Sequence, residues 1–133
     1  MYLLNHDVVF ELLKSSSCDN VSNWCKAIAP SDLYISVITI GNLIKKVQKD
    51  ISIQQKSLFQ FWLQTNFLAW FGENVLSVDL RIIQRWGHVI PDSYTSTVDS
   101  LLIATAIEHN LVLVTSLYAT NRISYLKLFN PFI

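Results

Sequence analysis

The chain has 133 residues, of which 51% are hydrophobic and 15% charged, and its ten Lys and Arg balance ten Asp and Glu. This length favours one domain over residues 1–133, able to bury a core without disulfides or metal. The balanced charge excludes binding of nucleic acid through overall positive charge, so any site for a polyanion must be local. The low charged fraction predicts a buried partner surface, and we expect a homodimer or a complex.

Cysteine usage and hydropathy both indicate the cytoplasm. Cys18 and Cys25 fit no zinc-ligand spacing, so we expect two reduced thiols without a redox role. The first apolar run is too short for a signal peptide, and no apolar stretch approaches the ~20 residues that span a bilayer. The sequence therefore predicts a soluble cytoplasmic protein without a membrane segment.

The first half of the chain alternates apolar runs of strand type with helical patterns. Asn5, His6 and Asp7 stand where the first strand turns into a helix, and Asn20 is the expected N-cap of the next helix. The elements predicted here are strands over 2–5 and 33–39 and helices over 8–14, 21–29, 40–50 and 51–71.

The second half continues the same alternation. Asp79 is the expected N-cap of a helix. The predicted elements are strands over 74–79, 111–116 and around 125–129, and helices over 80–90 and 97–110. Wholly apolar strands that alternate with helices imply a parallel sheet covered on both faces. Because ligands of such sheets bind beyond the carboxyl ends of the strands, polar residues at those ends are the candidate site.

Four segments, in order and over nearly the whole length, carry a family pattern. They read NHDVVFELL from Asn5, ISVITIGN from Ile35, VDLRIIQRWG from Val78 and DSLLIATAIEHNLVLVT from Asp99. Together they resemble PIN-domain proteins, specifically VapC-type toxins of bacterial toxin–antitoxin systems. The resemblance implies an α/β fold, a three-layer α/β/α PIN-like sandwich with a central parallel sheet of four to five strands.

The resemblance also implies a metal-dependent ribonuclease, but most of its acids are replaced. In active relatives three or four carboxylates hold Mg²⁺ or Mn²⁺, because hard divalent cations require anionic oxygen ligands. Carried over position by position, the acids fall on Asn5, Asn42, Asp99 and Thr120, and only Asp99 can ionise. We therefore expect weak or absent metal binding at Asp99 and lost or strongly reduced ribonuclease activity.

Two aspartates remain as candidate catalytic residues. Asp99 either serves as the remaining metal ligand or stabilises the dipole of its own helix. Asp7 either turns into the cleft or caps the helix that follows it, and we expect the cap. Asn5 and Asn42 are expected to hydrogen-bond with each other and with Asp99. The alternative function is an active Mg²⁺- or Mn²⁺-dependent endoribonuclease toxin that uses Asp7 and Asp99.

Further positions are candidates for contact with RNA or a partner. Thr115 and Ser116 follow the fourth predicted strand and either contact phosphate or form the turn. Lys45, Lys46 and Lys49 form a basic cluster that would contact phosphates without reading sequence, and a solvated helix face is the simpler interpretation. The resemblance implies a cognate antitoxin as partner. We expect the chain to act through binding of antitoxin, homologue or RNA.

Overall fold

The computed structural model describes residues 1–13, 18–50, 52–65, 70–89, 96–116 and 125–133. The helices are α1 (His6–Leu13), α2 (Asp19–Ala27), α3 (Val37–Asp50), α4 (Ile53–Thr65), α6 (Leu80–Val89) and α7 (Thr97–Glu108), with a short 3₁₀ helix over Pro30–Asp32. The strands are β1 (Tyr2–Leu4), β2 (Leu33–Ser36), β3 (Val75–Leu76), β4 (Val112–Val114) and β5 (Lys127–Phe129).

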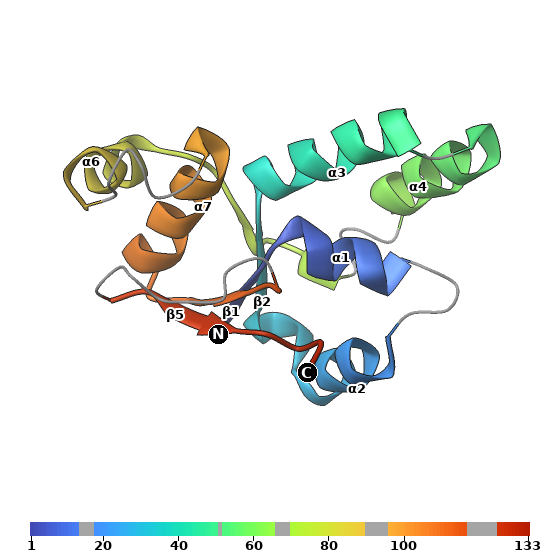
Figure 1. Cartoon of the computed structure of the whole chain (residues 1–133), viewed down its shortest axis with the longest axis horizontal. Coiled ribbons are helices and arrows are strands. Elements are labelled where there is room, and N and C mark those ends of the chain that lie inside the picture. The colour runs from blue at the N-terminus through green and yellow to red at the C-terminus, as the bar shows by residue number, and fades with distance from the viewer. Residues whose placement is uncertain (14–17, 51, 66–69, 90–95, 117–124) are drawn as a thin grey trace.

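All described strand pairs run parallel, in the order β3-β2-β1-β4-β5. The central strand β1 pairs through Leu3 with Tyr34 of β2 and with Leu113 of β4. Figure 1 shows α1, α2, α3 and α4 on one side of the strands and α6 and α7 on the other. The predicted three-layer α/β/α arrangement around a parallel sheet is confirmed, with five strands.

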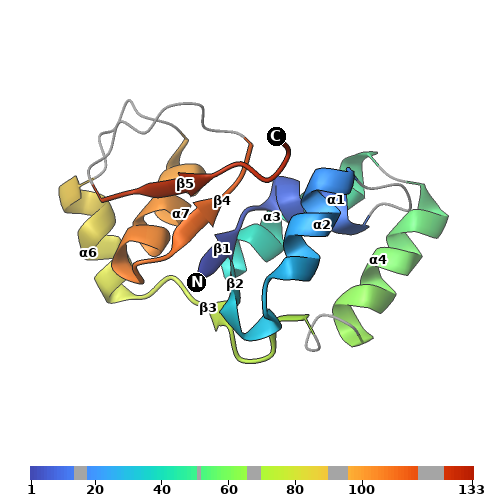
Figure 2. The same cartoon turned by 90° about the horizontal axis from the view of Figure 1, so that it is seen from below.

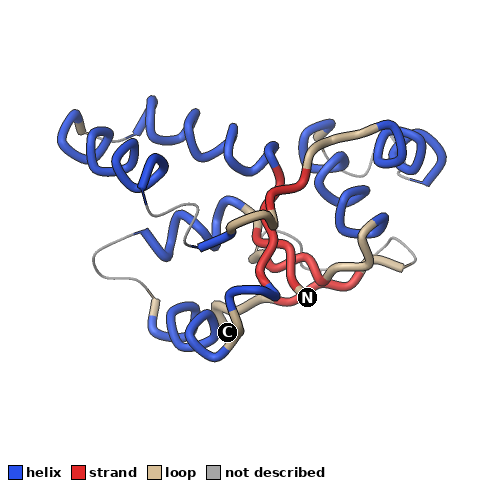
Figure 3. Tube along the Cα trace, turned by 180° about the vertical axis from the view of Figure 1, so that it is seen from behind, coloured by secondary structure: helices blue, strands red, loops and turns tan. Residues whose placement is uncertain are grey.

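Successive strand residues enter different layers because side chains alternate across a sheet. Leu4 and Val114 belong to the hydrophobic cluster beneath α1, α2 and α3. Leu3 and Leu113 belong to a second cluster beneath α6 and α7. All four side chains are fully buried. The sheet seen at the centre of Figure 3 thus separates two apolar layers, which explains why its strands are apolar on both faces.

The helices after β1 and β2 begin earlier than the periodicity predicts. Asn5 Oδ1 accepts the backbone N–H of His6 at 2.8 Å, and α1 starts there and not at residue 8. Ser36 Oγ accepts the N–H of Ile38 at 3.1 Å, and α3 starts at Val37. In both places a polar side chain at the end of a strand satisfies an amide of the first helical turn.

Two predicted N-caps have different outcomes. Asp79 Oδ1 accepts the N–H of Ile82 at 3.1 Å, which confirms the first. The second prediction is wrong, because α2 begins at Asp19 and the side chain of Asn20 donates instead to the carbonyl of Phe132 at 3.1 Å. Asn20 therefore holds the C-terminal segment, which runs from β5 toward α2 in Figure 2.

An aromatic contact also links α2 to both ends of the chain. The ring of Trp24 lies 5.2 Å from that of Tyr2 in β1 and 5.5 Å from that of Phe129 in β5. The first and last strands are therefore packed on one side chain of α2. Among the described residues, none of the helices has both the length and the apolar character needed to cross a bilayer.

Candidate functional site

A buried polar pair lies at the carboxyl ends of the adjacent strands β1 and β4. The backbone N–H of Asn5 donates to Val114 O at 3.1 Å, which continues the β1–β4 ladder into the turn. The side chains of Asn5 and Thr115 are 0% and 2% exposed. Asn5 Nδ2 donates to Thr115 Oγ1 at 3.2 Å. Residues 110 positions apart in the sequence are thus joined where the predicted cleft lies.

Asp7 extends this pair into a network. The hydroxyl of Thr115 donates to the two carboxylate oxygens of Asp7 at 3.0 and 3.1 Å. The backbone N–H and the hydroxyl of Ser116 donate to Asp7 Oδ2 at 2.7 and 2.8 Å. The expectation that Asp7 caps its own helix is wrong, because the carboxylate turns toward the end of β4 and receives its hydrogen bonds from there.

The two expected partners of Asn5 are replaced by others. Its Oδ1 accepts the N–H of His6 and lies 3.1 Å from His6 Nδ1, while its Nδ2 binds Thr115. The expected hydrogen bond between Asn5 and Asn42 is therefore absent, and Asn42 lies half-buried on α3. We call the side chains of Asn5, His6, Asp7, Thr115 and Ser116 the β1–β4 network.

Asp99 lies in the first turn of α7 and is half-buried. Its backbone N–H donates to the N-cap hydroxyl of Ser96 at 3.2 Å. A carboxylate at this position is stabilised by the positive end of the helix, as one of the two sequence interpretations requires. Thr120, the fourth family position, lies outside the described residues.

The donor set does not fit a divalent cation. Mg²⁺ and Mn²⁺ need several hard oxygen ligands with anionic charge, and here the first two family positions carry amides. Both oxygens of Asp7 already accept hydrogen bonds. Within the described part of the chain, no three side chains of His, Cys, Asp or Glu are grouped so that they could hold a metal.

The lysines of α3 differ in their surroundings. Lys45 and Lys49 are exposed, whereas Lys46 is half-buried, with Nζ 4.4 Å from the centre of the Phe10 ring. A cation over an aromatic face gains electrostatic stabilisation, so Lys46 helps to pack α3 on α1.

Cys18 and Cys25 are free thiols, both half-buried. Burial raises the pKa of the Cys25 thiol, which disfavours the reactive thiolate. The absence of a redox role for the two cysteines stays a prediction.

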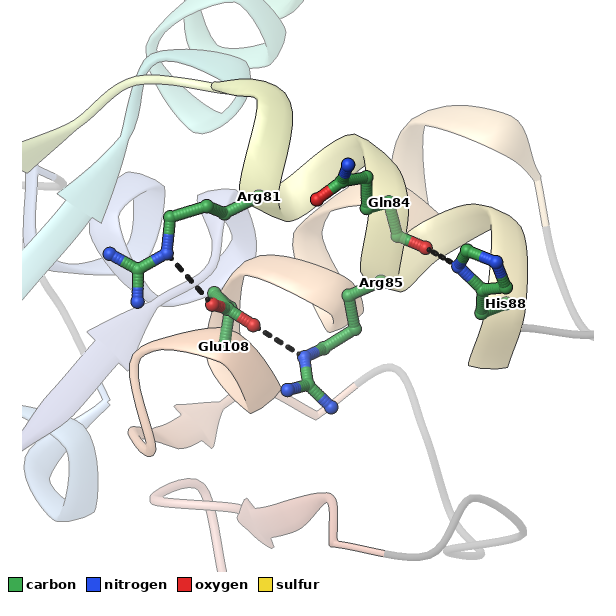
Figure 4. A pocket seen from close by; sticks show the side chains of 5 residues that line it. All are labelled: Arg81, Gln84, Arg85, His88 and Glu108. Atoms are coloured by element: carbon green, nitrogen blue, oxygen red, sulfur yellow. Dashed lines mark hydrogen bonds and ion pairs between the residues drawn. The ribbon is translucent and has the colours of Figure 1, made fainter.

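A second polar group, which the sequence interpretation left unassigned, lies on α6 and the end of α7. A surface hollow there is lined by Arg81, Gln84, Arg85, His88 and Glu108 (Figure 4). Arg81 Nε and Arg85 Nε bind the two oxygens of Glu108 at 3.2 and 2.6 Å. The hydrogen bond from Arg85 holds the pKa of Glu108 below its usual range. The basic spacing over 81, 85 and 88 was the available sequence signal, because it places three side chains on one helix face.

Curated proteins of similar sequence are bacterial toxins. Toxin FitB of Neisseria gonorrhoeae is 25% identical over 138 aligned positions, which cover 98% of each chain. The VapC ribonuclease Y4jK of Sinorhizobium fredii is also 25% identical, over 98% of this chain and 97% of the relative. No family model matches the chain.

Solved structures of similar fold come from toxin–antitoxin complexes. FitAB bound to an IR36 DNA fragment contains a chain with a TM-score of 0.88 and 20% identity, covering 100% of this chain and 96% of that one. VapBC2 of Rickettsia felis, bound to a DNA fragment from its promoter, gives a TM-score of 0.74 and 23% identity, with 97% of each chain covered. The resemblance to VapC-type PIN-domain toxins is confirmed, and so is the PIN-like fold.

Proposed function

Starting from a chain that has the PIN-like fold and resembles VapC and FitB toxins from end to end, we propose a toxin-type protein with lost or strongly reduced ribonuclease activity. It acts by binding an antitoxin, a homologue or RNA. The observation that carries the proposal is the β1–β4 network, in which hydrogen bonds join Asn5, Asp7 and Thr115 where the resemblance implies a metal-binding cluster. This protein is expected in the cytoplasm.

The physical argument concerns the cost of bringing a cation into the network. A divalent ion would have to displace the donors of Thr115 and Ser116 from Asp7. Thr115 is buried, so its displaced hydroxyl costs about 1–3 kcal/mol if it stays unsatisfied, whereas the exposed Ser116 can turn to water. Removing the ion's own hydration shell costs more, which several carboxylates would normally offset. A single carboxylate that is already hydrogen-bonded offers too little in return.

The antitoxin is the partner that the comparisons favour, since several structures of similar fold are toxin–antitoxin complexes. The chain also has apolar side chains available for a partner. Leu58 and Phe61 on α4 are 70% and 63% exposed and lie three residues apart, on one helix face. Leu80 on α6 is 70% exposed. Exposed apolar groups of this size are typical of partner surfaces, in a heteromer or in the expected homodimer.

One metal-binding experiment tests the loss of the acidic site. Isothermal calorimetry with millimolar Mn²⁺ compares the wild type with the double variant Asn5→Asp, Asn42→Glu, which restores two acids of the family pattern. The control, Asn23→Asp with Gln48→Glu, makes the same charge change at exposed positions of α2 and α3. We expect measurable binding by the restored variant only, because it alone adds anionic ligands at the strand ends.

A cleavage assay completes this test. The wild type, incubated with total RNA and Mg²⁺ or Mn²⁺, should leave the RNA intact. Metal-dependent cleavage by the pure wild type that disappears in an Asp99→Ala variant would overturn the proposal.

The alternative, an active Mg²⁺- or Mn²⁺-dependent endoribonuclease, has one observation in its favour. Asp7 turns toward the end of β4 and not onto its own helix, so its carboxylate lies on the side of the expected cleft. This enzyme would need Asp7 together with Asp99. It is excluded if the wild type binds no Mn²⁺, or if Asp7→Asn leaves any observed cleavage unchanged.

A further inference from the structure

We propose that α6 carries a site for the phosphodiester backbone of a nucleic acid, formed by Arg81 and Arg85 and extended along the helix by His88. This site deepens the RNA-binding part of the proposed function, but it lies on a different part of the molecule. Asp99 and Glu108 stand at opposite ends of α7, ~13 Å apart along its axis at 1.5 Å per residue.

The carboxylate of Glu108 orients both guanidinium groups. Each arginine binds Glu108 through Nε, so the two Nη groups of each are not used in that contact. In Figure 4 the guanidinium groups lie on either side of the carboxylate, with their Nη ends directed away from it. These Nη ends diverge, so they suit two separate anionic groups of one polyanion better than a single small anion.

The charge of the hollow is positive even with Glu108 ionised. Two arginines against one carboxylate leave a net positive charge of one. The ring Nδ1 of His88 lies 2.7 Å from the carbonyl oxygen of Gln84. Because that oxygen can only accept, Nδ1 carries the proton, and Nε2 takes no part in this contact. An arginine fork is well suited to phosphate oxygens.

The lining of the hollow favours nucleic acid over an acidic protein. Its five residues carry two guanidinium groups, an imidazole, an amide and one carboxylate, so the hydrogen-bond donors that it offers outnumber its acceptors. Interfaces with nucleic acid are more polar and more positive than those between proteins. Arg81, Arg85 and His88 are spaced over ~10 Å of one helix face, a linear arrangement that matches a polymer of regularly spaced charges.

Fluorescence anisotropy of labelled oligonucleotides tests the site, in low salt with EDTA so that cleavage has no influence. One arm uses single-stranded RNA and the other duplex DNA, which separates the two sources of the same phosphodiester chemistry. The test variant is Arg81→Gln with Arg85→Gln. The matched control, Lys26→Gln with Lys127→Gln, removes the same charge from exposed positions of α2 and β5.

We expect the arginine variant to bind at least ten-fold more weakly to one or both oligonucleotides, and the lysine variant to change less than three-fold. The slope of log affinity against log salt should fall by about 1.4 for single strands or about 1.8 for duplex DNA, the loss of two phosphate contacts. Equal losses in both variants, or a larger loss in the lysine variant, would show that α6 is not the site.

Two further measurements keep the test decisive. If the double variant melts well below the wild type, Arg81→Gln alone carries the test, because Arg81 is 77% exposed and its removal leaves the Arg85–Glu108 bond in place. About a three-fold loss is then expected, and no loss contradicts the site. Competition by poly-glutamate as effective as RNA at equal charge would assign the surface to an acidic protein and overturn the proposal. A failure here leaves the metal-binding result untouched, so the two proposals fail separately.

Discussion

At the scale of single residues, Asp7 shows how one carboxylate can join the ends of two strands. Four donor contacts reach it from Thr115 and Ser116, and charge-assisted hydrogen bonds of this kind are stronger than neutral ones. Thr115 also accepts from Asn5, so the hydroxyl relays between an amide and an acid. The network is therefore expected to contribute to folding stability and not only to function.

Asp7→Asn should lower the free energy of unfolding by about 1–2 kcal/mol, because it replaces a charged acceptor and turns an amide N–H₂ toward groups that donate. Urea unfolding followed by circular dichroism measures the change. The matched control is Asp19→Asn, an exposed first-turn residue of α2, for which less than about 0.5 kcal/mol is expected. Equal effects of both substitutions would mean that the network adds no stability.

The sequence identified the members of this network better than their contacts. Asn5, His6 and Asp7 were placed where the first strand turns into a helix, and Thr115 and Ser116 were recognised as the end of a strand. The direction of Asp7 was mispredicted because it depends on which strand lies next to β1. That strand is β4, some 110 residues further along the chain, and local periodicity carries no information about this pairing.

At the scale of elements, the periodicity located the described strands and α-helices, but it missed the short 3₁₀ helix over Pro30–Asp32 and several boundaries. It placed the start of α1 two residues late, since it could not show that the Asn5 side chain would satisfy the N–H of His6. It also overextended β3, which comprises only Val75–Leu76 at the sheet edge. Boundaries follow hydrogen bonds of individual side chains, whereas hydrophobic patterns report only which face is buried.

The bridge between α6 and α7 should make stability depend on acidic pH. Because the arginines lower the pKa of Glu108 in the folded chain, its contribution is complete above the ordinary glutamate value of 4.5 and is lost as pH falls through the lower folded value. Glu108→Gln should therefore lower the free energy of unfolding by about 1 kcal/mol at pH 7, which is the upper end of the range for partly exposed ion pairs. The loss should become progressively smaller below pH ~4.5.

Urea midpoints of wild type and variant between neutral and acidic pH measure this difference. Glu73→Gln, at an exposed position, serves as the control and should stay within about 0.5 kcal/mol throughout. A Glu108→Gln effect that is constant with pH would show that the ion pair contributes nothing to the folded state.

At the scale of the whole molecule, the sheet lies between two apolar layers, and α3 of one layer also contacts α7 of the other. Leu3 and Leu4 are neighbours in β1, both 0% exposed, yet they belong to different layers. The sequence predicted this two-faced burial from the wholly apolar strands, and it predicted one domain over residues 1–133. Whether both layers unfold together is the physical content of that second prediction.

Leu3→Ala and Leu4→Ala test whether the two layers unfold together or as separate units. Each removes most of a fully buried side chain from one layer. Each should lower the free energy of unfolding by about 3 kcal/mol, a value typical of such cavities. If the sheet couples the layers, either substitution shifts one common transition, with coincident curves from circular dichroism at 222 nm and tryptophan fluorescence. Leu58→Ala, at a site 70% exposed on α4, provides the unaffected control. If Leu3→Ala instead produced an early step that left the rest of the transition at the wild-type midpoint, α6 and α7 would form a separate unit, and the charged surface of α6 would open independently of the β1–β4 network.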